Sequence, residues 1–84
     1  MATVKAYAFY DKKLGAFMLP FWQPNEAVAK RAAKYSLNEK NSNLYPIRAD
    51  LELWELGEFD DTIGTITGNE MKCIAGMGVL IDDQ

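Results

Sequence analysis

Residues 51–56, LELWEL, alternate strictly, so that Leu51 and Leu53 point to one side of an extended chain and Trp54 to the other. This period of two predicts a β-strand with one face buried. Residues 3–10, TVKAYAFY, have the same period and predict a second strand. Its two faces carry Lys5, Tyr7 and Phe9 on one side, and Val4, Ala6, Ala8 and Tyr10 on the other. The chain is therefore expected to build a sheet.

A hairpin is predicted after the first strand. Residues 11–15, DKKLG, contain turn formers and end in a glycine that can adopt a positive φ. Residues 16–22 then resume an aromatic-rich extended segment. Because Pro20 cannot donate a backbone hydrogen bond, this second arm is expected to be an edge strand or to leave the sheet there.

A single helix is predicted from Glu26 to about Leu37. Pro24 and Asn25 precede it, with Asn25 as the N-cap and Glu26 in the first turn. The apolar stripe expected from helical spacing consists of Val28, Ala32 and Tyr35, with Ala29 and Ala33 beside it. These small residues would let the helix approach a sheet closely.

The rest of the chain completes one small α+β domain over residues 1–84. We expect a connecting loop at 38–50, a turn at 57–64, and a partner strand at 65–68 or reaching residue 74. The tail, residues 75–84, is expected to be either a last strand or a mobile segment. The predicted order is β-β-α-β-β, a mostly antiparallel sheet with one helix packed on one face. The uncovered face must then meet water, a partner chain or a ligand.

Charge is distributed unevenly along the 84 residues, whose formal net charge is −3. Residues 1–48 carry eight basic and three acidic side chains, whereas residues 49–84 carry one basic and nine acidic side chains. This pattern is compatible with a basic patch for a polyanion, an acidic face for a basic partner, or head-to-tail self-association. It is equally compatible with two halves that attract each other within one fold.

Catalytic, cofactor and metal sites are not expected. The chain has no histidine and no glycine-rich phosphate loop. Asp60 and Asp61 with Glu58 offer carboxylates for Mg²⁺, but adjacent acids beside glycines are more typical of a solvated turn. The single cysteine, Cys73, permits no internal disulfide and is predicted to be a buried, inert thiol in a reducing cytoplasm. No leader is expected, because the chain does not open with a charged and then apolar segment, and no membrane span is expected, because the longest uncharged run, residues 14–25, is short and contains Pro20.

Three blocks of the sequence resemble the small nonstructural protein of gokushovirus-type microviruses, which are phages with circular single-stranded DNA. They are YAFYDKK at 7–13, FMLPFWQPNEAVAKRAA at 17–33 and LELWELGEFDDTIGTI at 51–66. The resemblance implies a bacteriophage protein in the host cytoplasm, loosely assigned to DNA binding or to phage DNA replication and packaging. Residues 73–84 lie outside the matching blocks.

Two functions compete at this point, and neither requires a small-molecule substrate. In the first, the protein is an interaction and assembly module that forms homodimers or binds a phage or host protein. Its expected partner-binding residues are Phe21, Trp22, Trp54 and Leu56. In the alternative, the protein binds single-stranded DNA, with aromatic side chains that stack on the bases and cations that contact the phosphates. The competing interpretation of these aromatics is that they pack in the core. The residues expected to bind DNA are Lys5, Tyr7, Phe9, Lys12, Lys13, Lys30, Arg31 and Lys34.

Overall fold

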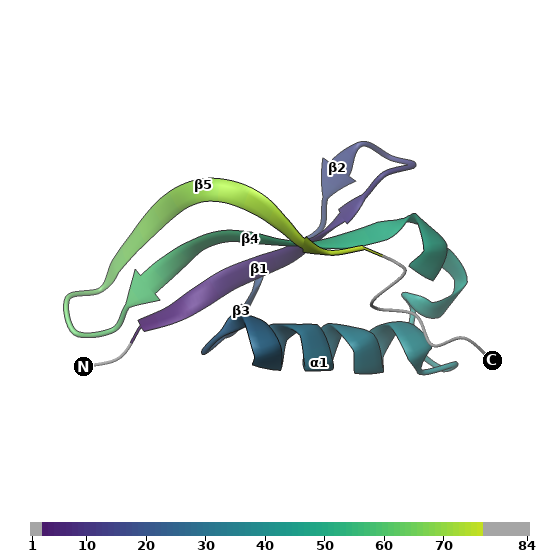
Figure 1. Cartoon of the computed structure of the whole chain (residues 1–84), viewed down its shortest axis with the longest axis horizontal. Coiled ribbons are helices and arrows are strands. Elements are labelled where there is room, and N and C mark those ends of the chain that lie inside the picture. Colours follow the sequence, from purple (N-terminus) through teal and green to yellow (C-terminus); the bar gives the residue numbers. More distant parts are fainter. Residues whose placement is uncertain (1–2, 77–84) are drawn as a thin grey trace.

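An antiparallel sheet with one long helix along one side makes up the fold (Figure 1). The computed structural model describes residues 3–76. Its elements are β1 (Thr3–Asp11), β2 (Ala16–Phe17), β3 (Phe21–Gln23), α1 (Glu26–Asn38), the 3-10 helix η1 (Tyr45–Asp50), β4 (Leu51–Asp60) and β5 (Thr65–Ala75). The described strands are ordered β2-β1-β4-β5, and β3 also pairs with β1. The predicted α+β class is confirmed.

The predicted hairpin forms, and its second arm is broken as expected. Gly15 has φ 70°, and the Asp11 carboxylate accepts hydrogen bonds from the backbone N–H groups of Lys13 and Leu14 at 2.9 and 3.2 Å. The chain then pairs with β1 twice, once through β2 and again through β3. The interruption between these two strands contains Pro20, which has no N–H to donate.

Helix α1 begins where predicted, but it buries a different stripe. The Asn25 side chain accepts a hydrogen bond from the backbone N–H of Val28 at 3.0 Å, which confirms the N-cap. The buried residues are Ala29, Ala33 and Leu37. The expected stripe through Tyr35 is wrong, because this side chain is 73% exposed. Small side chains at Ala29 and Ala33 bring the helix close to the sheet, so the larger Tyr35 lies on the solvent side.

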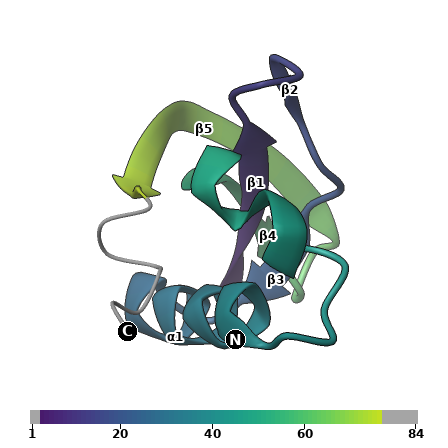
Figure 2. The same cartoon turned by 90° about the vertical axis from the view of Figure 1, so that its right-hand side faces the viewer.

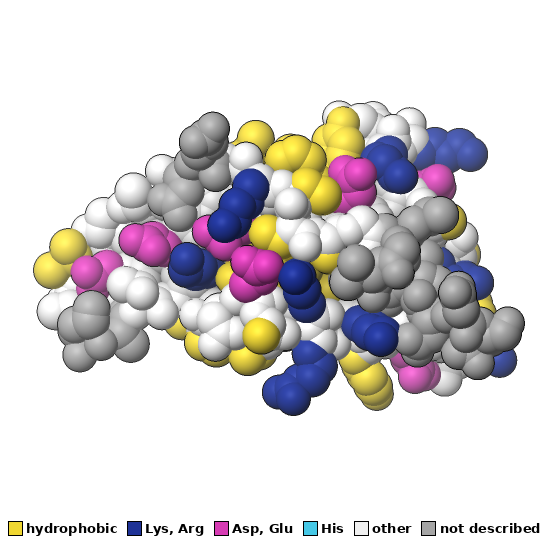
Figure 3. All heavy atoms as spheres, in the orientation of Figure 1, with side chains coloured by type: hydrophobic (Ala, Val, Ile, Leu, Met, Phe, Trp, Pro, Cys, Tyr) yellow, Lys and Arg dark blue, Asp and Glu magenta, His cyan; other side chains and the backbone are white. Residues whose placement is uncertain are grey.

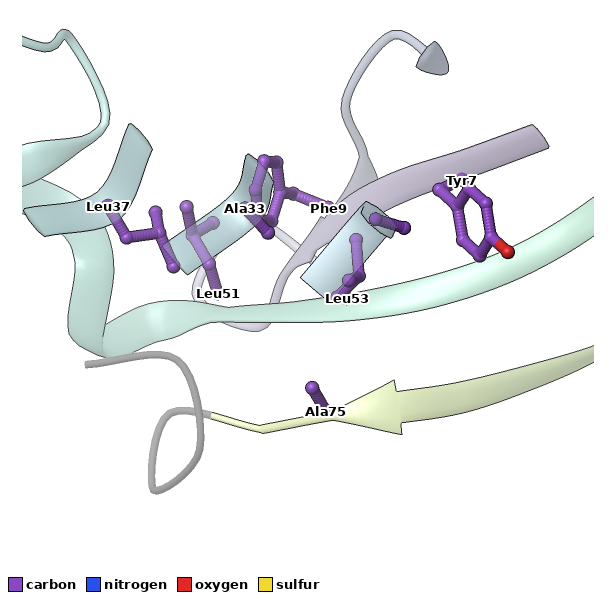
Figure 4. Close-up of a cluster of buried hydrophobic side chains, with 8 residues drawn as sticks. Tyr7, Phe9, Ala33, Leu37, Leu51, Leu53 and Ala75 are labelled. Atoms are coloured by element: carbon purple, nitrogen blue, oxygen red, sulfur yellow. The ribbon is translucent and has the colours of Figure 1, made fainter. Parts of the chain in front are cut away.

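The core lies between α1 and the inner face of the sheet, the face that carries Tyr7 and Phe9 (Figure 4). Leu51 and Leu53 of β4 complete this face, in the alternation expected from the sequence. Leu37 fills the space opposite them, and its side chain is fully buried. Figure 2 looks along the molecule and shows α1 on one side of the curled sheet only.

Several predicted boundaries require correction. The expected loop at 38–50 includes the 3-10 helix η1, and β4 continues to Asp60 through the first half of the expected turn at 57–64. The reason is Gly57, which is buried within β4 and pairs with Gly68 of β5. A Cβ at Gly57 would collide with the carbonyl oxygen of Thr67, so glycine permits this close pairing and does not end the strand.

Strand β5 forms an irregular edge of the sheet. Its register with β4 shifts between the pairs Glu55–Lys72 and Gly57–Gly68, which leaves extra residues on β5. The strand accordingly arches away from β4 in Figure 1. Of the predicted tail, residues 75 and 76 are described and Ala75 is buried, whereas residues 77–84 lie outside the described residues. No helix within residues 3–76 is long and apolar enough to cross a membrane.

Tyr7 combines full burial with a hydroxyl that has no hydrogen-bond partner among the described residues. Burial, together with the nearby carboxylates of Glu55 and Glu26, raises the pKa of Tyr7 from 10.0 to about 12. The ring therefore contributes through packing, while the hydroxyl contributes little to stability.

We expect Gly57→Ala to lower the free energy of unfolding by roughly 1 to 3 kcal/mol, since the added methyl group overpacks the contact with Thr67. Urea denaturation measures this change. Gly68→Ala is the matched control: the position is exposed and has no atom within 4 Å of an added Cβ, so its effect should stay within about 0.5 kcal/mol. Equal effects of the two substitutions would contradict the packing described for β4 and β5.

We also expect Tyr7→Phe to change the free energy of unfolding by less than about 1 kcal/mol at neutral pH, whereas Tyr7→Ala should cost roughly 3 to 5 kcal/mol. The raised pKa of Tyr7 contributes to the free energy of unfolding, and this contribution is complete below pH 10. It is lost as the pH rises toward about 12. Wild type should therefore lose stability relative to Tyr7→Phe between these pH values. A constant difference between the two proteins over this range would contradict the raised pKa.

Candidate functional site

The predicted stacking platform for single-stranded DNA does not exist in the folded protein. Tyr7 is completely buried and Phe9 is 7% exposed, and both pack in the core. A base can stack only on a ring whose face is accessible. The prediction was wrong because the face of β1 that carries these rings is the one that α1 covers.

The predicted basic residues are also dispersed. Lys12 and Lys13 are exposed in the turn between β1 and β2, and the backbone N–H of Lys12 donates to the carbonyl oxygen of Asp50 at 2.8 Å. Lys30 forms an ion pair with Glu26 across one turn of α1, with an N–O distance of 3.1 Å. The remaining predicted cations of α1, Arg31 and Lys34, are exposed. The eight predicted residues thus fall in the core, in a turn, on the sheet and on the helix.

Charged residues of both signs lie on the inner face of the sheet. Lys5 lies directly opposite Glu58 and forms an ion pair with Glu55, with an N–O distance of 3.6 Å. Glu55 in turn lies opposite Lys72 of β5. The basic first half and the acidic second half therefore attract each other here, and Figure 3 shows charged side chains of both signs over this part of the molecule. In the Lys5–Glu55 pair the ammonium group is partly exposed, whereas the carboxylate is buried, so Lys5 compensates a charge that is largely shielded from water.

One predicted partner-binding residue, Phe21, packs against the core. The Phe21 ring packs against Tyr7 and Phe9, with centroid distances of 6.1 and 5.8 Å. Because Phe21 is paired opposite Tyr7, it shares the inner face and lies half-buried against the core, on the other side of the sheet from Trp22 and Trp54. Leu56 is half-buried at the irregularity where β4 has one more residue than β1.

A first aromatic cluster lies on the outer face of the sheet, the face turned away from α1. Its members are Tyr10, Phe17 and Trp54. The centroid of the Tyr10 ring lies 4.8 Å from that of Phe17 and 6.1 Å from that of Trp54. The indole Nε1–H of Trp54 donates to the Glu52 carboxylate at 3.2 Å. Hydrophobic side chains gather beside β2 at the upper edge of Figure 3.

A second aromatic cluster lies further along the same face. The Trp22 and Phe59 rings meet at 5.9 Å with an edge contact. Together with Val4 and Ile66 they line a shallow apolar hollow of about 340 Å³. Four strands meet here, since Val4 pairs with Phe59 and Phe59 with Ile66. Phe59 and Ile66 were not predicted. Strict alternation from Leu51 would place Phe59 on the inner face, and only the extra residue of β4 at the irregularity brings it to the outer face.

Small residues in β1 allow large rings to lie over the outer face. Ala8 is completely buried and Ala6 is 7% exposed, although both lie on the side away from α1. Their cross-strand partners are Trp54 and Trp22, whose side chains shield them. The rings themselves remain accessible, with Trp22 41% exposed. The two clusters thus follow one another along the outer face of β1, and together they are called the aromatic strip.

The described residues provide no candidate metal centre. No group of three or more His, Cys, Asp or Glu side chains among them is arranged to hold a metal ion. Cys73 is exposed, so the prediction of a buried thiol was wrong. Its neighbour along β5, Ile74, is half-buried instead, because successive residues of a strand face opposite ways.

Comparison with known proteins gives one match. Residues 4–79 match the family model described as Phage ORF5 protein. Apart from Thr3, the first residue of β1, this range includes all the strands and helices of the described residues. No match was found among curated proteins or among solved structures. The family match covers most of the 84 residues. The chain therefore belongs to the Phage ORF5 protein family and is a bacteriophage protein.

Proposed function

We propose that this phage protein is a non-enzymatic interaction and assembly module that forms a homodimer through the outer face of its sheet. The observation that carries the proposal is the aromatic strip formed by the two outer clusters. Contiguous accessible apolar surface of this kind generally marks an interaction site, and Trp, Tyr and Phe are enriched in the buried centres of interfaces.

Exposed apolar side chains add to this surface. Phe17, Trp22 and Ile66 are 38%, 41% and 68% exposed, and all three belong to the strip. Met18 and Leu19, in the connection that follows β2, are 37% and 89% exposed. Two outer faces that pack against each other would bury these side chains as in a sheet-on-sheet sandwich. Because the same patch is used by both copies, the simplest assembly is a twofold symmetric dimer.

The sheet edges are less suited to self-association than the face. Strand β5 carries extra residues in the middle of its pairing with β4, and such bulges discourage pairing with another chain. The opposite edge consists of the short strands β2 and β3, which are separated by a segment containing Pro20. These features favour association through side chains of the outer face over extension of the sheet.

We further propose that the protein is a nonstructural accessory protein of a gokushovirus-type microvirus, acting in the host cytoplasm during phage DNA replication or packaging. Membership of the Phage ORF5 protein family supports a phage setting. The three blocks that resemble the microvirus protein contain most of the aromatic strip: Tyr10, Phe17, Trp22, Trp54, Phe59 and Ile66. The resemblance thus falls largely on the surface proposed to associate.

The alternative of a DNA-binding surface on the N-terminal hairpin has lost its main support. Tyr7 and Phe9 would have to leave the core to stack on bases, and exposing two large buried aromatic side chains would cost several kcal/mol. The lysines of the turn, Lys12 and Lys13, remain exposed, but the described structure places neither beside these rings.

We expect sedimentation equilibrium at micromolar concentration to give about twice the chain mass of 9.5 kDa. Ile66→Glu should weaken the dimer at least about tenfold, because it places a charge in an interface that should be dry. Ile66→Lys should weaken the dimer equally. This second variant shows that the loss of apolar contact is the cause, because a lysine would not be repelled by acidic side chains. Since Ile66 is 68% exposed, neither substitution should change the thermal midpoint much.

Tyr35→Glu is the matched control, because Tyr35 is 73% exposed on α1, on the other side of the sheet. This variant should dimerise like wild type. A monomeric wild type would contradict self-association and would leave the outer face to a different phage or host protein. Wild-type dimerisation of both Ile66 variants would show that another surface forms the dimer.

A further inference from the structure

The solvent face of α1 carries an exposed aromatic ring beside two cations. Tyr35 is 73% exposed, Arg31 precedes it by one helical turn, and Lys34 is its neighbour in sequence. With Asn38 and Glu39 these residues line a shallow hollow of about 300 Å³. Side chains three or four positions apart on a helix lie about 5 to 6 Å apart at their Cβ atoms, so Arg31 and Asn38 both lie within reach of the Tyr35 ring.

Packing does not explain the position of Tyr35. The helix is anchored to the sheet through Ala29, Ala33 and Leu37, which are all buried. Tyr35 lies outside this stripe and outside the hydrophobic core cluster. A single exposed aromatic residue is ordinary on a protein surface, but this ring lies in a hollow that is also lined by Arg31 and Lys34.

The charges around the hollow favour an anionic ligand. Arg31 and Lys34 contribute two positive charges, and Glu39 contributes the negative charge of the lining. Lys30 lies on the preceding turn, with its charge paired to Glu26. The acidic residues of the β4–β5 turn, Asp60 and Asp61, lie at the far end of the molecule from the C-terminal end of α1 (Figure 1). Lys and Arg side chains are visible along the lower part of Figure 3, where α1 lies.

We propose that this helix face, Arg31, Lys34, Tyr35 and Asn38, binds single-stranded nucleic acid. The Tyr35 ring stacks on one unpaired base, and Arg31 and Lys34 contact the phosphates on either side of it. An accessible aromatic ring beside cations is the combination by which proteins hold single strands without reading their sequence. An acidic peptide would satisfy the cations, but it would have no flat apolar group for the ring.

This site shares Arg31 and Lys34 with the DNA-binding surface expected from the sequence, but its aromatic ring is a different one. It uses neither the buried pair Tyr7 and Phe9 nor the lysines of the β1–β2 turn. It also lies on the other side of the sheet from the aromatic strip, so a dimer formed through the outer faces would leave both copies of α1 accessible. Nucleic-acid binding and dimerisation can therefore fail independently.

The test is fluorescence anisotropy of the intact protein with a labelled oligothymidine of about 20 nucleotides at low salt. The oligothymidine should bind more tightly than a duplex of equal length or a poly-glutamate peptide, because only the single strand offers unpaired bases. Tyr35→Ser should weaken binding roughly five- to hundredfold, whereas Tyr35→Phe should retain it, since the ring and not the hydroxyl makes the contact.

Charge variants identify the cations that contact phosphates. Two contacts predict a log–log salt dependence with a slope of about −1.4 for a single strand. The double substitution of Arg31→Gln with Lys34→Gln should remove most of this slope. Lys12→Gln with Lys13→Gln is the matched control, because it removes the same charge from the exposed β1–β2 turn and should leave binding unchanged. The variant Ile66→Glu, which should disrupt the dimer, should bind the oligothymidine as wild type does.

Four results would overturn the proposal. They are the absence of measurable binding at low salt, equal binding of the duplex or of poly-glutamate, unchanged binding by Tyr35→Ser, and a loss of binding that follows the Lys12 and Lys13 substitutions in place of those on α1. Circular dichroism of each variant should match wild type, because the substituted side chains are exposed.

Discussion

The contact between α1 and the sheet determines most of what this protein presents to its surroundings. Ala29 and Ala33 allow the helix to lie close to β3 and β4, and Leu37 fills the space against Leu51. A helix with larger residues in this stripe would stand further from the sheet and leave the buried rings of Tyr7 and Phe9 less well packed. The close approach is thus the condition for a dense core in a chain of only 84 residues.

Both candidate surfaces follow from this contact. Strand β1 has aromatic side chains on both faces, and one helix can cover only one of them. With Tyr7 beneath α1, Tyr10 and the rings opposite Ala6 and Ala8 lie on the outer face. The same packing turns Tyr35 toward solvent, between residues that carry positive charge. The protein therefore offers an aromatic face and a basic helix on opposite sides of one sheet.

Local patterns predicted the elements more reliably than the site. Asn25 as N-cap, the interruption near Pro20 and the alternation from Leu51 all appear as expected, because each depends on neighbouring residues. Gly57 was assigned to a turn, because its role in a strand depends on Thr67 of the partner strand. Trp22 and Trp54 were predicted as partner-binding residues, but Phe59 and Ile66, which complete the second cluster with Trp22, were missed.

The α+β class, the order of elements and the presence of a single helix were determined by the sequence alone, since periodicity, caps and turn residues act over a few positions. Tertiary structure decided which face of β1 became the core and which way Tyr35 points. It also brought Val4, Trp22, Phe59 and Ile66 together from four strands. These outcomes depend on strand register and on the rotation of α1 about its axis. Both are set by contacts between residues far apart in the chain, which no local pattern encodes.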